Sequence, residues 1–140
     1  MDVTRVASVM TPFPYSVDAR EDLHTARAMM QQHGIRHLPV MFNNTLAGVI
    51  SERELDVALA LTDEHLSNAA VAVWAICRRD PQVVELDESM VTVAELMANR
   101  QLGSVLVTRN GKLAGIITTV DICRAFAEVI RTPRVPDETA

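Results

Sequence analysis

The hydrophobic positions of the chain follow two kinds of pattern, and the same order of patterns occurs twice. Leu23, Ala26, Met29 and Met30 recur at the spacing of one helix face, which predicts a helix over residues 23–33. The other helices are predicted over residues 52–61, 90–100 and 119–130. Short apolar runs predict strands over residues 15–17, 37–42 and 46–51, and again over 82–86, 104–108 and 113–118. The order β-α-β-β-α is therefore predicted twice.

The two halves also align in sequence without a gap. Leu46-Ala47-Gly48-Val49-Ile50-Ser51 matches Leu113-Ala114-Gly115-Ile116-Ile117-Thr118, which lies 67 positions later. Internal similarity at a fixed spacing is the mark of a duplicated unit. We therefore predict one repeat over residues 5–62, a linker over 63–71, a second repeat over 72–130 and a flexible tail over 131–140.

Neither repeat is expected to be stable alone, because a unit of about 60 residues buries little apolar surface and is marginal. We expect an α+β fold in which the two repeats pack sheet against sheet with pseudo-two-fold symmetry. Asn43-Asn44 and Asn110-Gly111 lie between paired apolar runs, and these dipeptides predict β-hairpins.

Composition narrows the classes of function. The 140 residues carry a net charge of −5 and only 4% aromatic residues, which disfavours binding to nucleic acid or to an anionic membrane surface. Cys77 and Cys123 are far apart and belong to no Cys/His cluster, so we expect two reduced core thiols and no metal site. Without a signal-peptide pattern or a long apolar span, a cytoplasmic location is predicted.

The most informative motif is the junction between the last strand and the last helix of each repeat. Ser51 precedes Glu54 by three positions, and Thr118 precedes Asp121 by three. One interpretation is a capping box, in which the hydroxyl and the acid satisfy the first backbone N–H groups of the helix. The other is a ligand site, with phosphate at the helix start and a ribose diol on the carboxylate. The two interpretations are compatible.

These junctions, the tandem β-α-β-β-α units, the stretch HGIRHLPV and the opening SVMTPFPYSV resemble a pair of cystathionine-β-synthase (CBS) domains, called a Bateman module. The resemblance covers residues 5–130. It implies an adenosine-containing ligand such as AMP, ADP, ATP or S-adenosylmethionine in the cleft between repeats, acting as a regulatory ligand rather than a catalytic cofactor. It also implies a homodimer, and an output through that dimer or an unknown effector protein.

The resemblance further implies two unequal ligand sites. In the favoured site, Asp121 would hold the ribose and Thr118 would face the phosphate, with a wall formed by Ile116, Met10, Tyr15, Ile35, Arg36 and His37. The weaker site would comprise Ser51, Glu54, Val49, Cys77, Leu102, Gly103 and Ser104. It departs from the family pattern because Glu54 stands where Asp is usual, and the extra methylene displaces the carboxylate.

Several alternatives remain at this stage. Arg36 is either a phosphate ligand or a solvated surface charge, and His37 is either a pH-sensitive phosphate partner or a satisfied strand histidine. The module as a whole is either a ligand sensor or a structural dimerisation and adaptor module. Enzymatic activity is disfavoured, and no catalytic residue is predicted, because the chain has no nucleophile elbow, no metal-ligand spacing and no P-loop.

Overall fold

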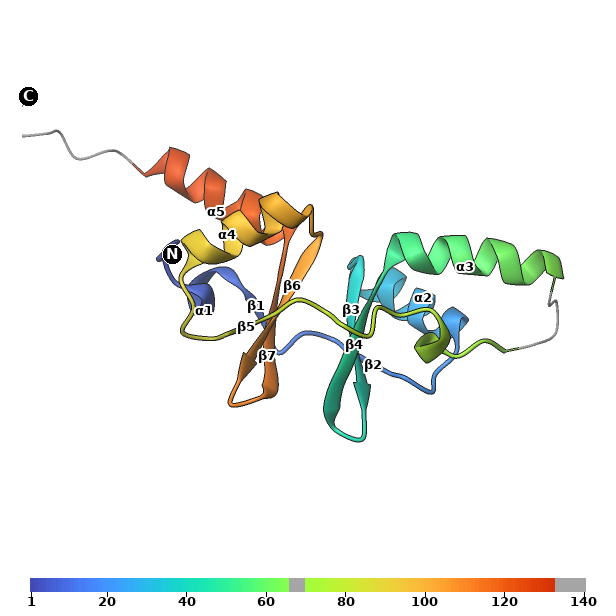
Figure 1. Cartoon of the computed structure of the whole chain (residues 1–140). Helices are drawn as coiled ribbons and strands as arrows, with labels where there is room; N and C mark the ends of the chain where they lie inside the picture. The colour runs from blue at the N-terminus through green and yellow to red at the C-terminus, as the bar shows by residue number, and fades with distance from the viewer. Residues whose placement is uncertain (66–69, 133–140) are drawn as a thin grey trace, which may run out of the picture.

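The computed structural model describes residues 1–65 and 70–132, and it contains two similar halves side by side (Figure 1). The first half contains β2 (Val17–Asp18), α2 (Leu23–His33), β3 (His37–Phe42), β4 (Thr45–Ser51), α3 (Glu52–His65) and the short 3-10 helix η1 (Val73–Ala75). The second contains α1 (Val6–Val9), β1 (Thr11–Pro12), β5 (Val83–Glu85), α4 (Met90–Arg100), β6 (Ser104–Arg109), β7 (Lys112–Thr118) and α5 (Thr119–Arg131). The predicted tail at 133–140 and the linker positions 66–69 lie outside the described residues.

Local sequence signals explain where the helices begin and end. The Asp22 carboxylate caps α2 by accepting a hydrogen bond of 2.8 Å from the Thr25 backbone N–H. The helix ends at Gly34, whose φ of 63° is the left-handed conformation that glycine adopts without strain. Ser89 caps α4 in the same way. The helix α3 continues to His65, four residues beyond its predicted end.

Both predicted hairpins are confirmed. Asn43 and Asn44 have positive φ of 50° and 62°, and Asn110 and Gly111 have 52° and 78°. Positive φ at both central residues is the type I′ geometry that matches the twist of paired strands. The turns join β3 to β4 and β6 to β7 as antiparallel pairs. Each half also has one parallel pair, β2 with β3 and β5 with β6. The strand predicted over 15–17 forms instead at Val17–Asp18.

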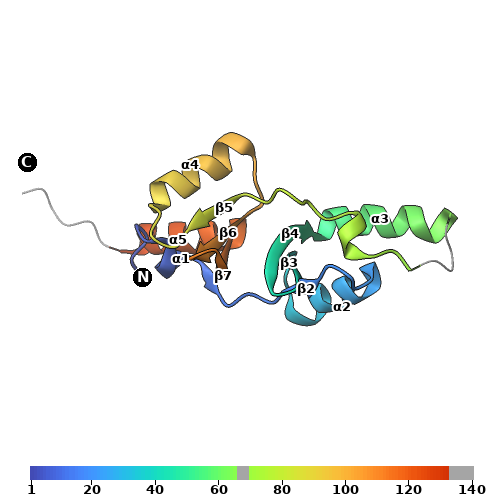
Figure 2. The ribbon, with the colours of Figure 1, turned by 60° about the horizontal axis from the view of Figure 1, so that its bottom comes forward.

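The opening segment of each repeat crosses to the other half, which the sequence patterns do not indicate. The segment β1 pairs with β7, so that Thr11 lies opposite Ile116. In the same relation, Arg78 of the second repeat bridges Val49 of β4 through backbone hydrogen bonds of 3.0 and 2.9 Å. Figures 1 and 2 show α1 and β1, in blue, beside α5 and β7, while η1 lies beside the green first half.

Two glycines make these crossings possible. A Cβ at Gly48 would collide with the backbone carbonyl of Arg78, and a Cβ at Gly115 would meet the side chain of Met10 and the carbonyl of Thr11. Gly48 and Gly115 are equivalent positions of the two repeats. Glycine is required at both because another backbone approaches closely.

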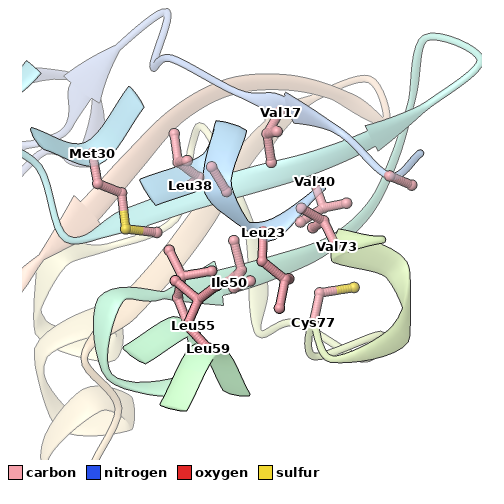
Figure 3. Close-up of a cluster of buried hydrophobic side chains, with 12 residues drawn as sticks. Val17, Leu23, Met30, Leu38, Val40, Ile50, Leu55, Leu59, Val73 and Cys77 are labelled. Atoms are coloured by element: carbon pink, nitrogen blue, oxygen red, sulfur yellow. The ribbon is translucent and has the colours of Figure 1, made fainter. Parts of the chain in front are cut away.

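Each half has its own core, and a third cluster joins them. In the first half, Leu23, Leu38, Ile50 and Leu55 are fully buried together with Val73 of η1 (Figure 3). The core of the second half is built around the following side chains: Val6, Val9, Met90, Val93, Val105 and Ile117.

Between the halves, Val49 of β4 packs with Leu106 of β6 and Ile116 of β7. The predicted α+β fold is confirmed, with two repeats packed sheet against sheet. The pseudo-two-fold symmetry is visible in the matched pairings Thr11–Ile116 and Arg78–Val49.

Candidate functional site

The two strand-to-helix junctions occupy equivalent places but differ in their surroundings. Thr118 ends β7 and Asp121 lies in the first turn of α5, whereas Ser51 ends β4 and Glu54 lies in the first turn of α3. These surroundings determine which of the two junctions is open to a ligand.

At the second-repeat junction the carboxylate is enclosed. Asp121 is only 3% exposed. Its Oδ2 accepts from the Thr118 backbone N–H at 2.8 Å and from the Thr118 hydroxyl at 3.2 Å. The Asp121 backbone N–H donates to the Thr118 side chain in return, which completes the capping box. Its Oδ1 accepts from the Thr11 hydroxyl at 2.9 Å, and Arg124 lies 3.4 Å away. Both oxygens are therefore used within the chain, and the carboxylate is not presented to a ribose in this conformation.

At the first-repeat junction the acid is exposed. The Ser51 hydroxyl donates to Glu54 Oε1 at 2.9 Å, and the Glu54 backbone N–H donates to Ser51 Oγ at 3.3 Å. The position equivalent to Thr11 is Arg78, which has no hydroxyl to close the junction. Arg78 is held by its backbone opposite Val49, two residues before Ser51 on β4. Glu54 thus keeps an oxygen available on the surface.

A cavity of about 830 Å³ lies beside Ser51 and Glu54. The first repeat contributes Arg36, His37, Val49 and the start of α3, and the second repeat contributes Arg78, Pro81, Gln82 and the segment Gln101–Ser104. The cavity therefore spans both repeats. Among the residues predicted for this site, Val49, Ser51, Glu54, Leu102, Gly103 and Ser104 line it. Cys77 lies instead in the first core, where burial raises the pKa of its thiol.

Arg36 and His37 line this same cavity, although the sequence assigned them to the wall of the other cleft. The strand-opening segments of the two repeats meet at the symmetry axis, and a Cβ on Gly103 would lie 2.9 Å from His37 Nε2. Burial lowers the pKa of His37 below its ordinary value of 6.5, while Glu54 and Glu52 act to raise it and Arg36 to lower it. His37 is therefore inside the charged cluster of the open cleft.

The remaining residues of the favoured site are dispersed around the enclosed junction. Met10 packs against Gly115, and Ile116 belongs to the cluster between the sheets. Ile35 packs on the first core. Tyr15 stacks on His33, with ring centroids 3.6 Å apart. At the junction on which the sequence preference for the cleft at Asp121 was based, the Thr11 hydroxyl binds the carboxylate, whereas the junction at Ser51 and Glu54 lines a cavity.

The cavity has a mixed charge lining that the sequence patterns only partly indicated. Arg36, Arg53 and Arg78 face Glu52, Glu54 and Asp56 around it. Asp56 is paired with Arg27 at 3.8 Å, whereas among residues 1–62 and 70–132 the three cavity arginines make no ion pair within 4.0 Å. Sequence analysis missed Asp56, Val57 and Gln101, which carry no motif of their own.

Comparison with known proteins fits this architecture. The family model described as the CBS domain matches the chain twice, over residues 6–61 and 73–128. The chain is a tandem pair of CBS domains. This pair is 26% identical over 121 residues to an inosine-5'-monophosphate dehydrogenase of Korarchaeum cryptofilum and 30% identical over 123 residues to a homoserine O-acetyltransferase of Methanococcoides burtonii. Each match covers 86% of the chain but only 24% of the relative, so the CBS pair spans about a quarter of each enzyme.

Solved structures have the same fold. The AcuB protein of Vibrio cholerae matches 93% of this chain and 96% of its own, with a TM-score of 0.83 and 23% identity. The CBS domain pair of protein MJ0100, solved with 5'-methylthioadenosine and S-adenosyl-L-methionine, matches 90% of this chain and 98% of its own, with a TM-score of 0.78 and 25% identity. CBSX2, solved with AMP, matches 91% and 99%, with a TM-score of 0.75 and 24% identity.

Two further findings concern the described part of the chain. Its helices include none with the length and apolar character needed to cross a membrane. Its His, Cys, Asp and Glu side chains form no group of three or more that could hold a metal ion.

Proposed function

We propose that this CBS pair is a regulatory sensor module rather than an enzyme. It binds an adenosine-containing ligand, of the class AMP, ADP, ATP or S-adenosylmethionine, in the open cleft beside Ser51 and Glu54. The bound ligand alters a partner protein or the module's own dimer. Cys77 is buried as expected, whereas Cys123 is exposed on α5 and is not a core thiol. Two free thiols suit a reducing cytoplasm.

The observation that carries the proposal is the cavity of about 830 Å³ built by both repeats. Small-molecule sites have volumes of roughly 300–1,000 Å³ and combine apolar walls with a few polar groups. Val49, Leu102 and Leu106 supply apolar surface, and the Ser51–Glu54 junction supplies the polar groups. A ligand that touches both walls bridges the repeats, which is what a sensor of their relative position requires.

The lining suggests how the parts of the ligand would be held. The Glu54 carboxylate is exposed and can accept hydrogen bonds from a ribose diol, and Ser51 lies at the start of α3, where backbone N–H groups favour an anion. The adenine would lie against Pro81, Leu102 and the backbone around Gly103. The CBS pair of MJ0100, which was solved with two adenosine compounds, supports this class of ligand.

The regulatory output follows from differential affinity. A ligand shifts an equilibrium between two arrangements of the repeats only by the ratio of its affinities for them. A homodimer is the simplest assembly that could respond to such a change. The helix α5 offers an apolar surface for it, since its exposed side chains include Val120, Phe126, Val129 and Ile130.

Isothermal titration calorimetry of the purified chain with AMP, ADP, ATP and S-adenosylmethionine tests the proposal. We expect saturable binding of at least one ligand with a dissociation constant below about 1 mM and one site per chain. Glu54→Ala should weaken this binding roughly 10-fold or more through loss of the ribose hydrogen bonds. Glu95→Ala is the matched control, because Glu95 is exposed on α4, away from the cavity lining.

The cleft at Thr118 and Asp121 is the second candidate site. It should stay unoccupied while the Thr11 hydroxyl holds Asp121. Binding that is lost in Asp121→Ala but retained in Glu54→Ala would restore the preference for that cleft.

The competing function is a structural dimerisation or adaptor module in which both junctions are only helix caps. The capping box at Thr118 and the apolar surface of α5 favour it. Absence of saturable binding by all four ligands, together with a stable dimer in sedimentation velocity, would select this alternative.

A further inference from the structure

The open cleft contains three arginines that no other part of the proposed function explains. Arg36 and Arg53 come from the first repeat and Arg78 from the second. The chain as a whole carries a net charge of −5, whereas in this cavity the three arginines equal in number the three acids Glu52, Glu54 and Asp56. Asp56 across the cavity already has Arg27 as a partner at 3.8 Å.

The equivalent residue of the other repeat indicates where the Arg78 side chain lies. Its equivalent, Thr11, lies opposite Ile116, and the Thr11 hydroxyl reaches the junction acid Asp121 at 2.9 Å. Arg78 lies opposite Val49 in the same way, so its side chain starts beside the junction of Ser51 and Glu54. Val49 and Ser51 are two residues apart on one strand, which is about 7 Å, a span that an arginine side chain covers.

The difference between the two junctions is thus a difference in chemistry. A threonine at this position gives its hydroxyl to the acid and closes the crevice. An arginine leaves the crevice open and adds a planar cation, which binds phosphate oxygens through two parallel hydrogen bonds. Arg78 lines the cavity and forms no ion pair within 4.0 Å with Glu54, so the junction acid does not hold its guanidinium.

We infer that Arg78 makes the open cleft selective for adenosine ligands that carry a 5'-phosphate. Adenosine and 5'-methylthioadenosine lack the anion that Arg78 would bind, and S-adenosylmethionine has a sulfonium cation near the same place. This inference rests on the proposed function, because it concerns which adenosine ligand the same cavity takes. Under this inference, one side chain, Arg78, determines which adenosine ligands bind tightly.

The experiment compares AMP, adenosine, 5'-methylthioadenosine and S-adenosylmethionine by calorimetry on the full chain. We expect AMP to bind at least 10-fold more tightly than the other three. Arg78→Met, which removes the cation but adds no hydroxyl that could close the junction as Thr11 does, should reduce AMP affinity about 10-fold or more and leave adenosine affinity unchanged. Arg79→Met is the matched control, because the Arg79 guanidinium donates to the Trp74 carbonyl at 2.8 Å and stacks on its ring, outside the cavity lining.

Four results would overturn the inference without removing the proposed function, which is binding of an adenosine-containing ligand by the wild type. The first is wild-type binding of adenosine, 5'-methylthioadenosine or S-adenosylmethionine as tight as that of AMP, and the second is an Arg78→Met chain that binds AMP like the wild type. The third is an equal loss of AMP and adenosine affinity in Arg78→Met, and the fourth is a loss in Arg79→Met equal to that in Arg78→Met. Failure of every ligand to bind the wild type would remove the proposed function and this inference together. Thermal unfolding of each variant verifies that the fold is retained.

Discussion

The two junctions of this protein differ in whether a hydroxyl group from the other repeat binds the acid. The sequence places a hydroxyl and an acid at the same spacing in both repeats, and the capping box that this spacing predicts forms at Thr118 and Asp121. The state of each acid depends on a residue from the other repeat. Thr11, 110 positions away from Asp121, encloses it, whereas Arg78 leaves Glu54 exposed. Local spacing does not indicate such a partner, and therefore the sequence could not predict which of the two acids is enclosed.

A pH dependence follows from His37. Burial lowers the pKa of His37 in the folded chain below the value of 6.5 that it has when unfolded. Above pH 6.5 both states are neutral at this residue. As the pH falls through 6.5, the unfolded chain takes up the proton first, so the free energy of unfolding decreases until the pH is below the folded pKa.

Urea unfolding of the wild type and of His37→Gln between pH 5 and 8 measures this effect. The charged groups around His37 are Glu54, Glu52 and Arg36. We expect the wild type to lose more stability than His37→Gln over the acid half of the range. Parallel curves for the two proteins would contradict the prediction.

At the scale of the element, much of the fold follows from local pattern. The helix spacing of Leu23, Ala26 and Met30, the cap at Asp22 and the stop at Gly34 all lie within one segment. The Asn-Asn and Asn-Gly turns fix both hairpins. The pairing of β1 with β7 could not be predicted in this way, because Thr11 and Pro12 form a two-residue strand defined only by its distant partner. The same holds for the short helix α1.

The two equivalent glycines, Gly48 and Gly115, differ in the atoms that an added Cβ would meet. A Cβ at Gly48 would collide with the Arg78 carbonyl, which is backbone and is fixed by its bridge to Val49. A Cβ at Gly115 would collide first with the Met10 thioether, a flexible side chain that can move. We therefore expect Gly48→Ala to be the more destabilising of the two.

Thermal and urea unfolding of both variants test this difference. We expect Gly48→Ala to lower the free energy of unfolding by about 2–4 kcal/mol, in the range of overpacked cores, and Gly115→Ala by about 1–2 kcal/mol. Because the two positions are equivalent in the repeats, each is the control for the other. Equal losses, or a larger loss in Gly115→Ala, would show that the Arg78 carbonyl is not the limiting contact.

At the scale of the whole molecule, the exchange of opening segments ties the two repeats into one folding unit. Val6 and Val9 of the first repeat lie in the core of the second half, and Val73 of the second repeat lies in the core of the first. Neither half has a complete core without the other repeat. A ligand that bridges the cleft therefore acts on a single cooperative structure, as a sensor of relative position requires.

Because the two cores depend on each other, a substitution that destabilises one half should also destabilise the other. Val6 is 1% exposed in the second half, and Trp74, the single tryptophan, reports on the first. Val6→Ala removes two buried methyl groups and should lower the free energy of unfolding by about 2 kcal/mol. Urea transitions followed by Trp74 fluorescence and by far-ultraviolet circular dichroism should shift together, as in two-state unfolding. Val91→Ala, at an exposed valine of the second half, should shift neither, and a Trp74 transition unmoved by Val6→Ala would mean that the halves unfold independently.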